Sequence, residues 1–296
     1  MVSQKAFAAL WSKALQKRNI LLFVYGFLLA SLFYFYVEDS YETQLFKGLA
    51  DYVKDKSSGE KNNEDALLLQ SLHLTNYLGR SRSFIYSHSE INALKSSLIH
   101  PVTYDLQTAN GACGSYAYIL SRLLNELKIP NRIAQMKVDN IYGGHILLEA
   151  KTSKGWVVLD GSYDLFFKKP DGNLASFADV QENWQYYQKQ VPSGYNYAYR
   201  YDGVRYTNWN KIPIMMPLTK RVISLFLGKQ GTDTFSMRTY FVRKFHVLFQ
   251  VTVFIYFILI SVAIFRYFRK NRYIANPLYV EGALHREIGN SKRTRA

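Results

Sequence analysis

Two long apolar runs constrain the fold of this 296-residue chain more than any other feature. Residues 20–37 contain no charged side chain over 18 residues, and residues 247–265 contain none over 19. A helix needs about 20 apolar residues to cross a bilayer, and aromatic residues near the ends of such a run are typical of membrane interfaces. The sequence therefore predicts transmembrane helices at 20–37 and 245–265. The first lacks the small-residue cleavage pattern of a signal peptide, so we interpret it as an uncleaved anchor.

The net charge of +15 lies mostly at the two ends of the chain. Residues 1–19 carry four Lys or Arg and no acid, and residues 266–296 carry eight Lys or Arg and two Glu. Basic flanks of membrane spans face the cytoplasm. We therefore predict cytoplasmic tails at 1–19 and 266–296, and a domain at 38–244 on the periplasmic or extracellular side of the plasma (inner) membrane. The basic ends are expected to contact anionic lipids and not nucleic acid.

The only cysteine, Cys113, stands at the start of a helical pattern. Apolar residues recur at helical spacing from Tyr116 to Leu127, and Pro130 ends the pattern. Backbone N–H groups and the helix dipole favour a thiolate at such an N-terminus. His145 and Asp160 follow in the order of a cysteine acyl-transfer triad, in which the histidine exchanges the proton and the aspartate orients the imidazole.

Three short apolar-rich segments after this helix predict strands at 132–138, 145–151 and 156–160, the last two forming a hairpin. A loop at residues 151–154 would place His145 directly opposite Asp160, so that the two side chains share one face of the sheet. A register slip of one residue would separate them.

At residues 104–165 the chain resembles the transglutaminase-like family of papain-fold cysteine enzymes. Four elements carry the resemblance in order: Gly111-x-Cys-Gly-Ser-Tyr-Ala117, the helix end Ile129-Pro-Asn-Arg132, the step Gly144-His145 and the strand Trp156-Val-Val-Leu-Asp160. The family commonly has glycine before the Ile-Pro step, where this chain has Lys128. The resemblance implies an α+β fold with a papain-like core, in which the helix bearing the cysteine packs on an antiparallel sheet, here between the two transmembrane helices.

The same resemblance implies a role for each residue of the triad. Cys113 would be the nucleophile, His145 the general base and acid, and Asp160 the residue that orients His145. Gln107 occupies the place of the oxyanion-hole glutamine of papain-like proteases. The expected activity is acyl transfer or hydrolysis of an amide or ester through a Cys113 thioester, on a protein, peptide or envelope polymer outside the membrane. Membrane proteins could be further partners.

Other interpretations of these residues stay open. A single cysteine is often a small buried hydrophobe, and His145 and Asp160 alone could be a strand-end histidine and a turn former. The main alternative function is a non-catalytic membrane scaffold of an envelope or surface-polysaccharide assembly with the same fold. We expect no cofactor and no metal, because the remaining histidines show no metal-ligand spacing and the chain lacks a phosphate-binding glycine loop.

Further segments outside this core carry weaker signals. Helices are predicted at 64–78 and 90–98. Alternating tyrosines from Tyr195 to Tyr201, within the aromatic stretch 184–209, would line one face of a strand and either bind a ligand or pack on the core. Residues 218–227 predict an amphipathic helix on the membrane surface.

Overall fold

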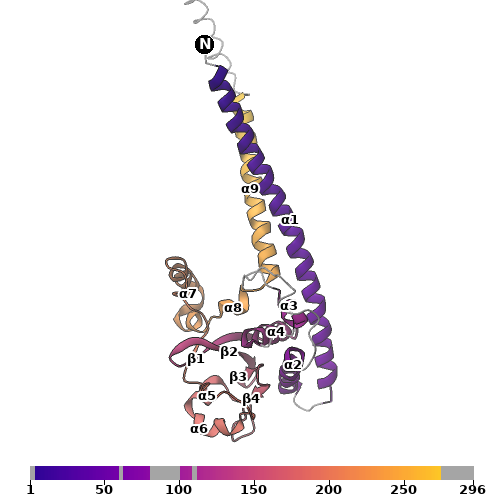
Figure 1. Cartoon of the computed structure of the whole chain (residues 1–296), viewed down its shortest axis with the longest axis vertical. Helices are drawn as coiled ribbons and strands as arrows, with labels where there is room; N and C mark the ends of the chain where they lie inside the picture. The colour runs from indigo at the N-terminus through magenta and orange to yellow at the C-terminus, as the bar shows by residue number, and fades with distance from the viewer. Residues whose placement is uncertain (1–3, 60–62, 81–100, 109–111, 275–296) are drawn as a thin grey trace, which may run out of the picture. The chain divides into compact units, whose positions relative to one another are not determined.

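The computed structural model describes residues 4–59, 63–80, 101–108 and 112–274, and it confirms an α+β fold (Figure 1). The chain forms two compact units. One contains the described parts of Met1–Tyr36 and His246–Ala296, and the other is Val37–Phe245. The helix expected at 90–98 lies outside the described residues, as does most of the C-terminal tail.

The first unit is built from the apolar parts of helices α1 (Gln4–Ser57) and α9 (Phe245–Ile274). Both helices are long and apolar enough to cross a membrane. They run side by side in Figure 1, and the Tyr25 hydroxyl donates a hydrogen bond to the Leu259 carbonyl at 3.1 Å. These helices meet the size and composition that a bilayer requires of a spanning segment.

Helix α1 continues beyond the apolar run into the second unit. Its side chains Glu42, Phe46, Ala50 and Val53 are buried there, at intervals of three and four residues. This spacing places them on one face of the helix. The last five turns of α1 are therefore a core helix of the central domain, which the charge-based division of the chain at residue 38 does not reveal.

A five-stranded antiparallel sheet forms the centre of the second unit, in the order β4-β3-β2-β1-β5. Its strands are β1 (Asn131–Val138), β2 (Ile141–Thr152), β3 (Gly155–Asp160), β4 (Leu165–Phe166) and β5 (Val204–Arg205). Alternate side chains point to opposite faces: Ile133 and Leu148 belong to one buried cluster, and Ala134 and Leu147 to the other. The sheet is therefore covered on both sides, which explains why apolar residues stand next to each other at Ile133-Ala134 in β1 and at Leu147-Leu148 in β2.

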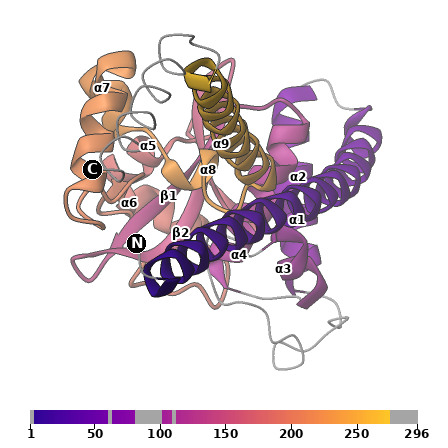
Figure 2. The same cartoon turned by 90° about the horizontal axis from the view of Figure 1, so that it is seen from above.

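Helices cover the two faces of the sheet unequally. One face packs on α4 (Cys113–Glu126), with α2 (Asn63–Arg80) and α3 (Val102–Thr108) beside it. The other face is covered by short elements and by the irregular aromatic segment: α5 (Phe177–Glu182), α6 (Trp184–Tyr187) and the 3₁₀ turn η1 (Gln188–Gln190). Figure 2 shows α2 and α4 on one side of β1 and β2, and α5 and α6 on the other. Helices α7 (Met215–Asp233) and α8 (Met237–Tyr240) complete the unit.

The register of the β2–β3 hairpin differs from the prediction by two residues. Ala150 pairs with Val157 and Thr152 with Gly155, so the loop holds only Ser153 and Lys154. Two residues that were expected in the loop extend the ladder instead. Because side chains alternate with a period of two, this shift leaves His145 and Asp160 on the same face, diagonally placed instead of directly opposite.

The alternating tyrosines do not form the strand that their spacing suggested. Residues 193–203 have no regular secondary structure, and Tyr201 has a φ of +59°. Tyr195 and Tyr201 are buried against the sheet, whereas Tyr197 is exposed. Packing on the core is therefore confirmed for the first two. A continuous aromatic face is not formed, because the backbone turns between these residues.

Candidate active site

Cys113 is the first residue of α4, and the end of this helix is open. The N-cap residue is Ala112, whose side chain cannot accept a hydrogen bond from the first turn. The initial backbone N–H groups of a helix lack the partner that later turns provide, and the N-cap side chain caps none of them here. The Cys113 side chain is half-buried. A partly accessible thiol thus lies at the positive end of a 14-residue helix.

His145 is presented by an irregularity in β2. Met136 pairs with His145, but the next residue of β1, Lys137, pairs with Tyr142, so Gly143 and Gly144 are extra residues of a bulge. Gly143 has a φ of +95°, and a Cβ on Gly144 would lie 2.7 Å from the Val138 Cβ. Bulges bend a strand and redirect the side chains beside them. Glycine is therefore favoured at both positions before His145, at Gly143 by the positive φ and at Gly144 by the close approach of Val138.

Asp160 ends β3 and contacts the imidazole directly. The His145 Nε2 lies 2.6 Å from Asp160 Oδ2, and both side chains are almost fully buried. The second carboxylate oxygen, Oδ1, accepts a hydrogen bond from the Ser162 backbone N–H at 3.0 Å. With both its oxygens engaged, the carboxylate is fixed, and it holds the ring so that Nδ1 is left for a different partner.

That partner is Cys113, and the two groups change each other's proton affinity. Burial raises the pKa of the Cys113 thiol, but the hydrogen bond to His145 and the charge on the imidazolium outweigh it and hold the pKa below its usual 9.0. Burial lowers the pKa of His145, whereas the Asp160 carboxylate and the Cys113 thiolate raise it to about 10. Both shifts favour a thiolate–imidazolium pair. The backbone N–H of Ile146 also contributes a hydrogen bond that lowers the pKa of the thiol.

Two tyrosine rings lie against the imidazole. Tyr199 stacks on His145 with the ring centroids 4.3 Å apart and an angle of 16° between the planes, and Tyr163 lies at 6.1 Å. The face of an aromatic ring attracts a cation. Sequence reasoning missed Tyr199 as a site residue, because it belongs to an irregular segment 54 positions after His145 with no periodic pattern.

Cys113 and His145 line an open cavity of about 560 Å³, and the buried Asp160 contacts His145 without lining it. Its lining also includes Gly79 and the exposed Arg80 from the end of α2, together with Tyr116, Ser162, Tyr163 and Tyr199. Gln107 lies half-buried on α3 and is not among the described residues that line this cavity. The structure thus brings Cys113, His145 and Asp160 together beside a space that a substrate could enter.

Asp139 and Asp164 are carboxylates that flank the site in sequence. Asp164 contacts His73, with its two carboxylate oxygens each 2.7 Å from the His73 Nδ1. Asp139 lies in the β1–β2 turn with a φ of +46°. Within the part of the chain that the structure describes, no group of three or more His, Cys, Asp or Glu side chains is arranged to hold a metal ion.

Comparisons with protein-family models, with curated proteins and with solved structures found no match to this chain. The transglutaminase-like resemblance therefore stays a prediction from the residues that carry it, and the case for function depends on the geometry of the site.

Proposed function

We propose that the protein is a membrane-anchored cysteine enzyme with a transglutaminase-like, papain-like core that transfers or hydrolyses acyl groups through Cys113. The observation that supports this most is the row formed by the half-buried Cys113 and the buried His145 and Asp160, with the 2.6 Å contact between the last two. A structural cysteine in a core has no need of an ionised partner. A nucleophilic cysteine requires one.

The proposed reaction uses the pair in its charged form. The Cys113 thiolate attacks the carbonyl carbon of an amide or ester, a C–S bond forms, and His145 gives its proton to the departing amine or alcohol. Water, an amine or a hydroxyl then attacks the thioester, its proton passes to His145, and the thiol group is released as thiolate. Asp160 keeps the imidazole oriented throughout and stabilises its positive charge.

The uncapped first turn of α4 is the proposed source of oxyanion stabilisation. The N-cap residue Ala112 provides no side-chain cap, and the Ser115 and Tyr116 N–H groups bond to the Ala112 carbonyl, so the N–H groups of Cys113 and Gly114 are the proposed donors. Donors fixed at a helix N-terminus stabilise the negative oxygen of a tetrahedral intermediate without moving during the reaction. Gln107 is not needed in this arrangement.

Reactivity of the thiol tests the proposal without knowledge of the substrate. We expect iodoacetamide to alkylate Cys113 in the purified full chain at a rate that reaches half of its plateau below pH 9, because His145 lowers the pKa of the thiol. In His145→Ala, the plateau should move to the alkaline side. Asp164→Asn is the matched control and should leave the profile unchanged, since Asp164 contacts His73.

The alternative of a non-catalytic scaffold makes the opposite prediction. An ordinary buried thiol would react slowly, with a half-maximal rate at or above pH 9 and no dependence on His145. That profile would refute the enzyme proposal. If the profile instead depends on His145 as the enzyme proposal expects, covalent trapping of an acyl group on Cys113 by peptide amides or esters would identify the substrate class.

A further inference from the structure

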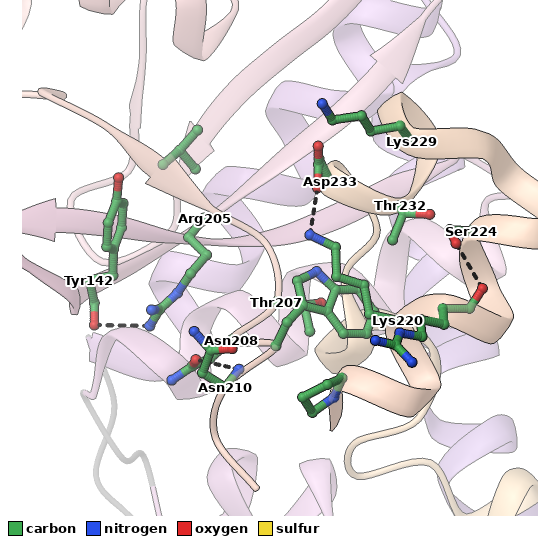
Figure 3. A pocket seen from close by; sticks show the side chains of 14 residues that line it. Tyr142, Arg205, Thr207, Asn208, Asn210, Lys220, Ser224, Lys229, Thr232 and Asp233 are labelled. Atoms are coloured by element: carbon green, nitrogen blue, oxygen red, sulfur yellow. Dashed lines mark hydrogen bonds and ion pairs between the residues drawn. The ribbon is translucent and has the colours of Figure 1, made fainter. Parts of the chain in front are cut away.

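A second cavity lies on the opposite edge of the sheet from β4, between β5, the start of β2 and helix α7. It has a volume of about 830 Å³ and shares no lining residue with the cavity at Cys113. Figure 3 shows the cationic side chains of Arg205, Lys220 and Lys229 around it, and Arg221 also lines it. The one carboxylate in its lining, Asp233, pairs with Lys220 at 3.1 Å. A cavity with this excess of positive charge is suited to an anionic ligand.

Arg205 is held in place at the floor of this cavity. Its Nη2 donates to the Gln135 side chain at 3.0 Å and to the Tyr142 carbonyl at 3.4 Å, and its guanidinium lies 5.0 Å from the Tyr142 ring. The Arg205 Nε is buried and has no hydrogen-bond partner within the described residues. A guanidinium that is held in one position at the wall of a cavity is suited to bind a phosphate or carboxylate.

Helix α7 is amphipathic, but its basic face lines the cavity and its apolar face is exposed. Pro217, Lys220, Arg221 and Ser224 line the cavity. Leu218, Val222, Leu225 and Phe226 recur at helical spacing on another face and are exposed, the last two by more than four-fifths. A helix of a water-soluble domain normally buries its apolar face against that domain. An exposed apolar face bordered by cations is instead typical of helices that lie in a membrane interface.

The same surface carries other features of a lipid contact. Trp209 and Tyr142 line the cavity, and such rings are favoured at the boundary between water and hydrocarbon. Only eleven residues separate α7 from α9, a helix apolar and long enough to cross a bilayer. If α9 is inserted in a bilayer, this short connection keeps α7 near the bilayer surface.

We propose that the cavity beside α7 binds the phosphate headgroup of an anionic lipid, while the apolar face at Leu218, Val222, Leu225 and Phe226 contacts the acyl chains. The ligand class is a phosphate ester, and the source to which the proposal commits is the bilayer. This site is separate from Cys113, and it does not depend on the proposed enzymatic function.

Lipid retention by the full chain tests the headgroup site. The wild type, purified in detergent with phosphatidylglycerol, should retain this lipid when examined by native mass spectrometry. Arg205→Gln combined with Arg221→Gln should weaken retention by about tenfold or more, since each cation near an anionic surface contributes appreciably. Lys151→Gln combined with Lys189→Gln is the control, because it removes the same charge from exposed positions outside the cavity. Equal retention by the two double variants would overturn the proposal.

A spin label on Phe226→Cys, in a Cys113→Ser background, tests the apolar face. In nanodiscs, the label should be accessible to oxygen and protected from a water-soluble nickel reagent. A label that is open to nickel, together with binding of glycerol phosphate in phosphatidylcholine nanodiscs, would show that the cavity takes a soluble phosphate ester and would refute the lipid assignment. Because the background variant lacks the proposed nucleophile, failure here leaves the enzyme proposal unaffected.

Discussion

The side chain on which the proposed chemistry depends most is Asp160, although it touches no substrate. It is the only described carboxylate bonded to His145, and the ring and the carboxylate are both shielded from water. In such a place the electrostatic attraction between the imidazolium and the carboxylate is weakly screened. The carboxylate therefore determines both the charge of the histidine and the ring nitrogen that faces Cys113.

We predict that Asp160→Asn keeps the fold and lowers the rate of Cys113 acylation by about two to four orders of magnitude, as neutralisation of a triad aspartate does. An amide cannot stabilise the imidazolium, and it favours the wrong tautomer. Stopped-flow acylation with an activated ester would measure the loss. Asp164→Asn supplies the control four residues away and should react as the wild type does. Similar losses in both variants would mean that Asp160 has no special role.

The double variant His145→Ala with Asp160→Ala should lose little more activity than His145→Ala alone, because the effects of residues that act as a unit are not additive.

Tyr199 provides a second residue-scale prediction, on pH dependence. The thiolate–imidazolium pair exists above the pKa of Cys113 and below that of His145, so reactivity through the pair should decline as pH rises through about 10. The stacked ring stabilises the imidazolium. Tyr199→Leu keeps the volume apolar but removes the aromatic face, and should lower the alkaline pKa by about 0.5–1 unit.

Tyr199→Phe retains the stacked face and is the matched control, with an expected alkaline limb like that of the wild type. Rates of Cys113 acylation by an ester with a poor leaving group, measured from acidic to alkaline pH, would give both limbs, because departure of the alcohol requires the His145 proton. An alkaline pKa that is identical in Tyr199→Leu, Tyr199→Phe and wild type would show that the stacking contributes only to packing.

At the scale of elements, the bulge in β2 is the feature that directs His145. Two extra glycines separate the regular ladder at Met136 and His145 from the pair Lys137 and Tyr142. Without them the strand would run on straight, and the bend that turns the His145 side chain toward the site would be lost.

We predict that Gly144→Ala destabilises the domain by about 1–3 kcal/mol, the usual cost of overpacking. Its Cβ would lie 2.7 Å from the Val138 Cβ, which is a branch point close to the backbone and cannot rotate away. Thermal unfolding in detergent, followed by circular dichroism, would show the loss. Gly48→Ala is the control: nothing lies within 4 Å of its Cβ, and alanine favours a helix more than glycine does. Unchanged unfolding of Gly144→Ala would show that the bulge accommodates a side chain.

The sequence predicted the elements around the site better than it predicted their exact pairing. Helix α4, helix α2 and the three long strands follow from periodicity and turn residues, as expected. The hairpin register was wrong by two, because Lys151 and Thr152 are polar and were assigned to the loop, whereas they pair with Trp156 and Gly155. The prediction that His145 and Asp160 share one face of the sheet was still correct, because a shift of two residues returns each side chain to the same face.

Long-range placement was beyond the sequence pattern. Tyr199 reaches His145 from an irregular segment whose path is set by packing of Tyr195 and Tyr201 on the sheet. Strand β5 contains only Val204 and Arg205, too short for any alternation to be visible. The buried stripe on α1 from Glu42 to Val53 does have helical spacing, and a search for that period beyond the apolar run would have found it.

At the scale of the whole molecule, the two apolar helices enclose the central domain in sequence. Helix α1 leads into the domain without a break, because it runs as one helix from Gln4 to Ser57. The domain leads into α9 at Phe245. A domain with both its ends joined to apolar helices has one compartment available to it if both helices span the bilayer, and the charge of the tails determines which one.

We predict that the central domain is outside the plasma membrane and both tails are in the cytoplasm, because residues 1–19 and 266–296 carry most of the net positive charge. Single cysteines in a Cys113→Ser background would report this in intact cells treated with a membrane-impermeant maleimide. Lys189→Cys, at an exposed position of the domain, should react before lysis. Lys5→Cys and Lys292→Cys should react only after lysis. Labelling of the two tail positions in intact cells, with Lys189→Cys protected, would reverse the orientation. The thiol of Cys113 would then lie in the reducing cytoplasm, and an envelope polymer could no longer be its substrate.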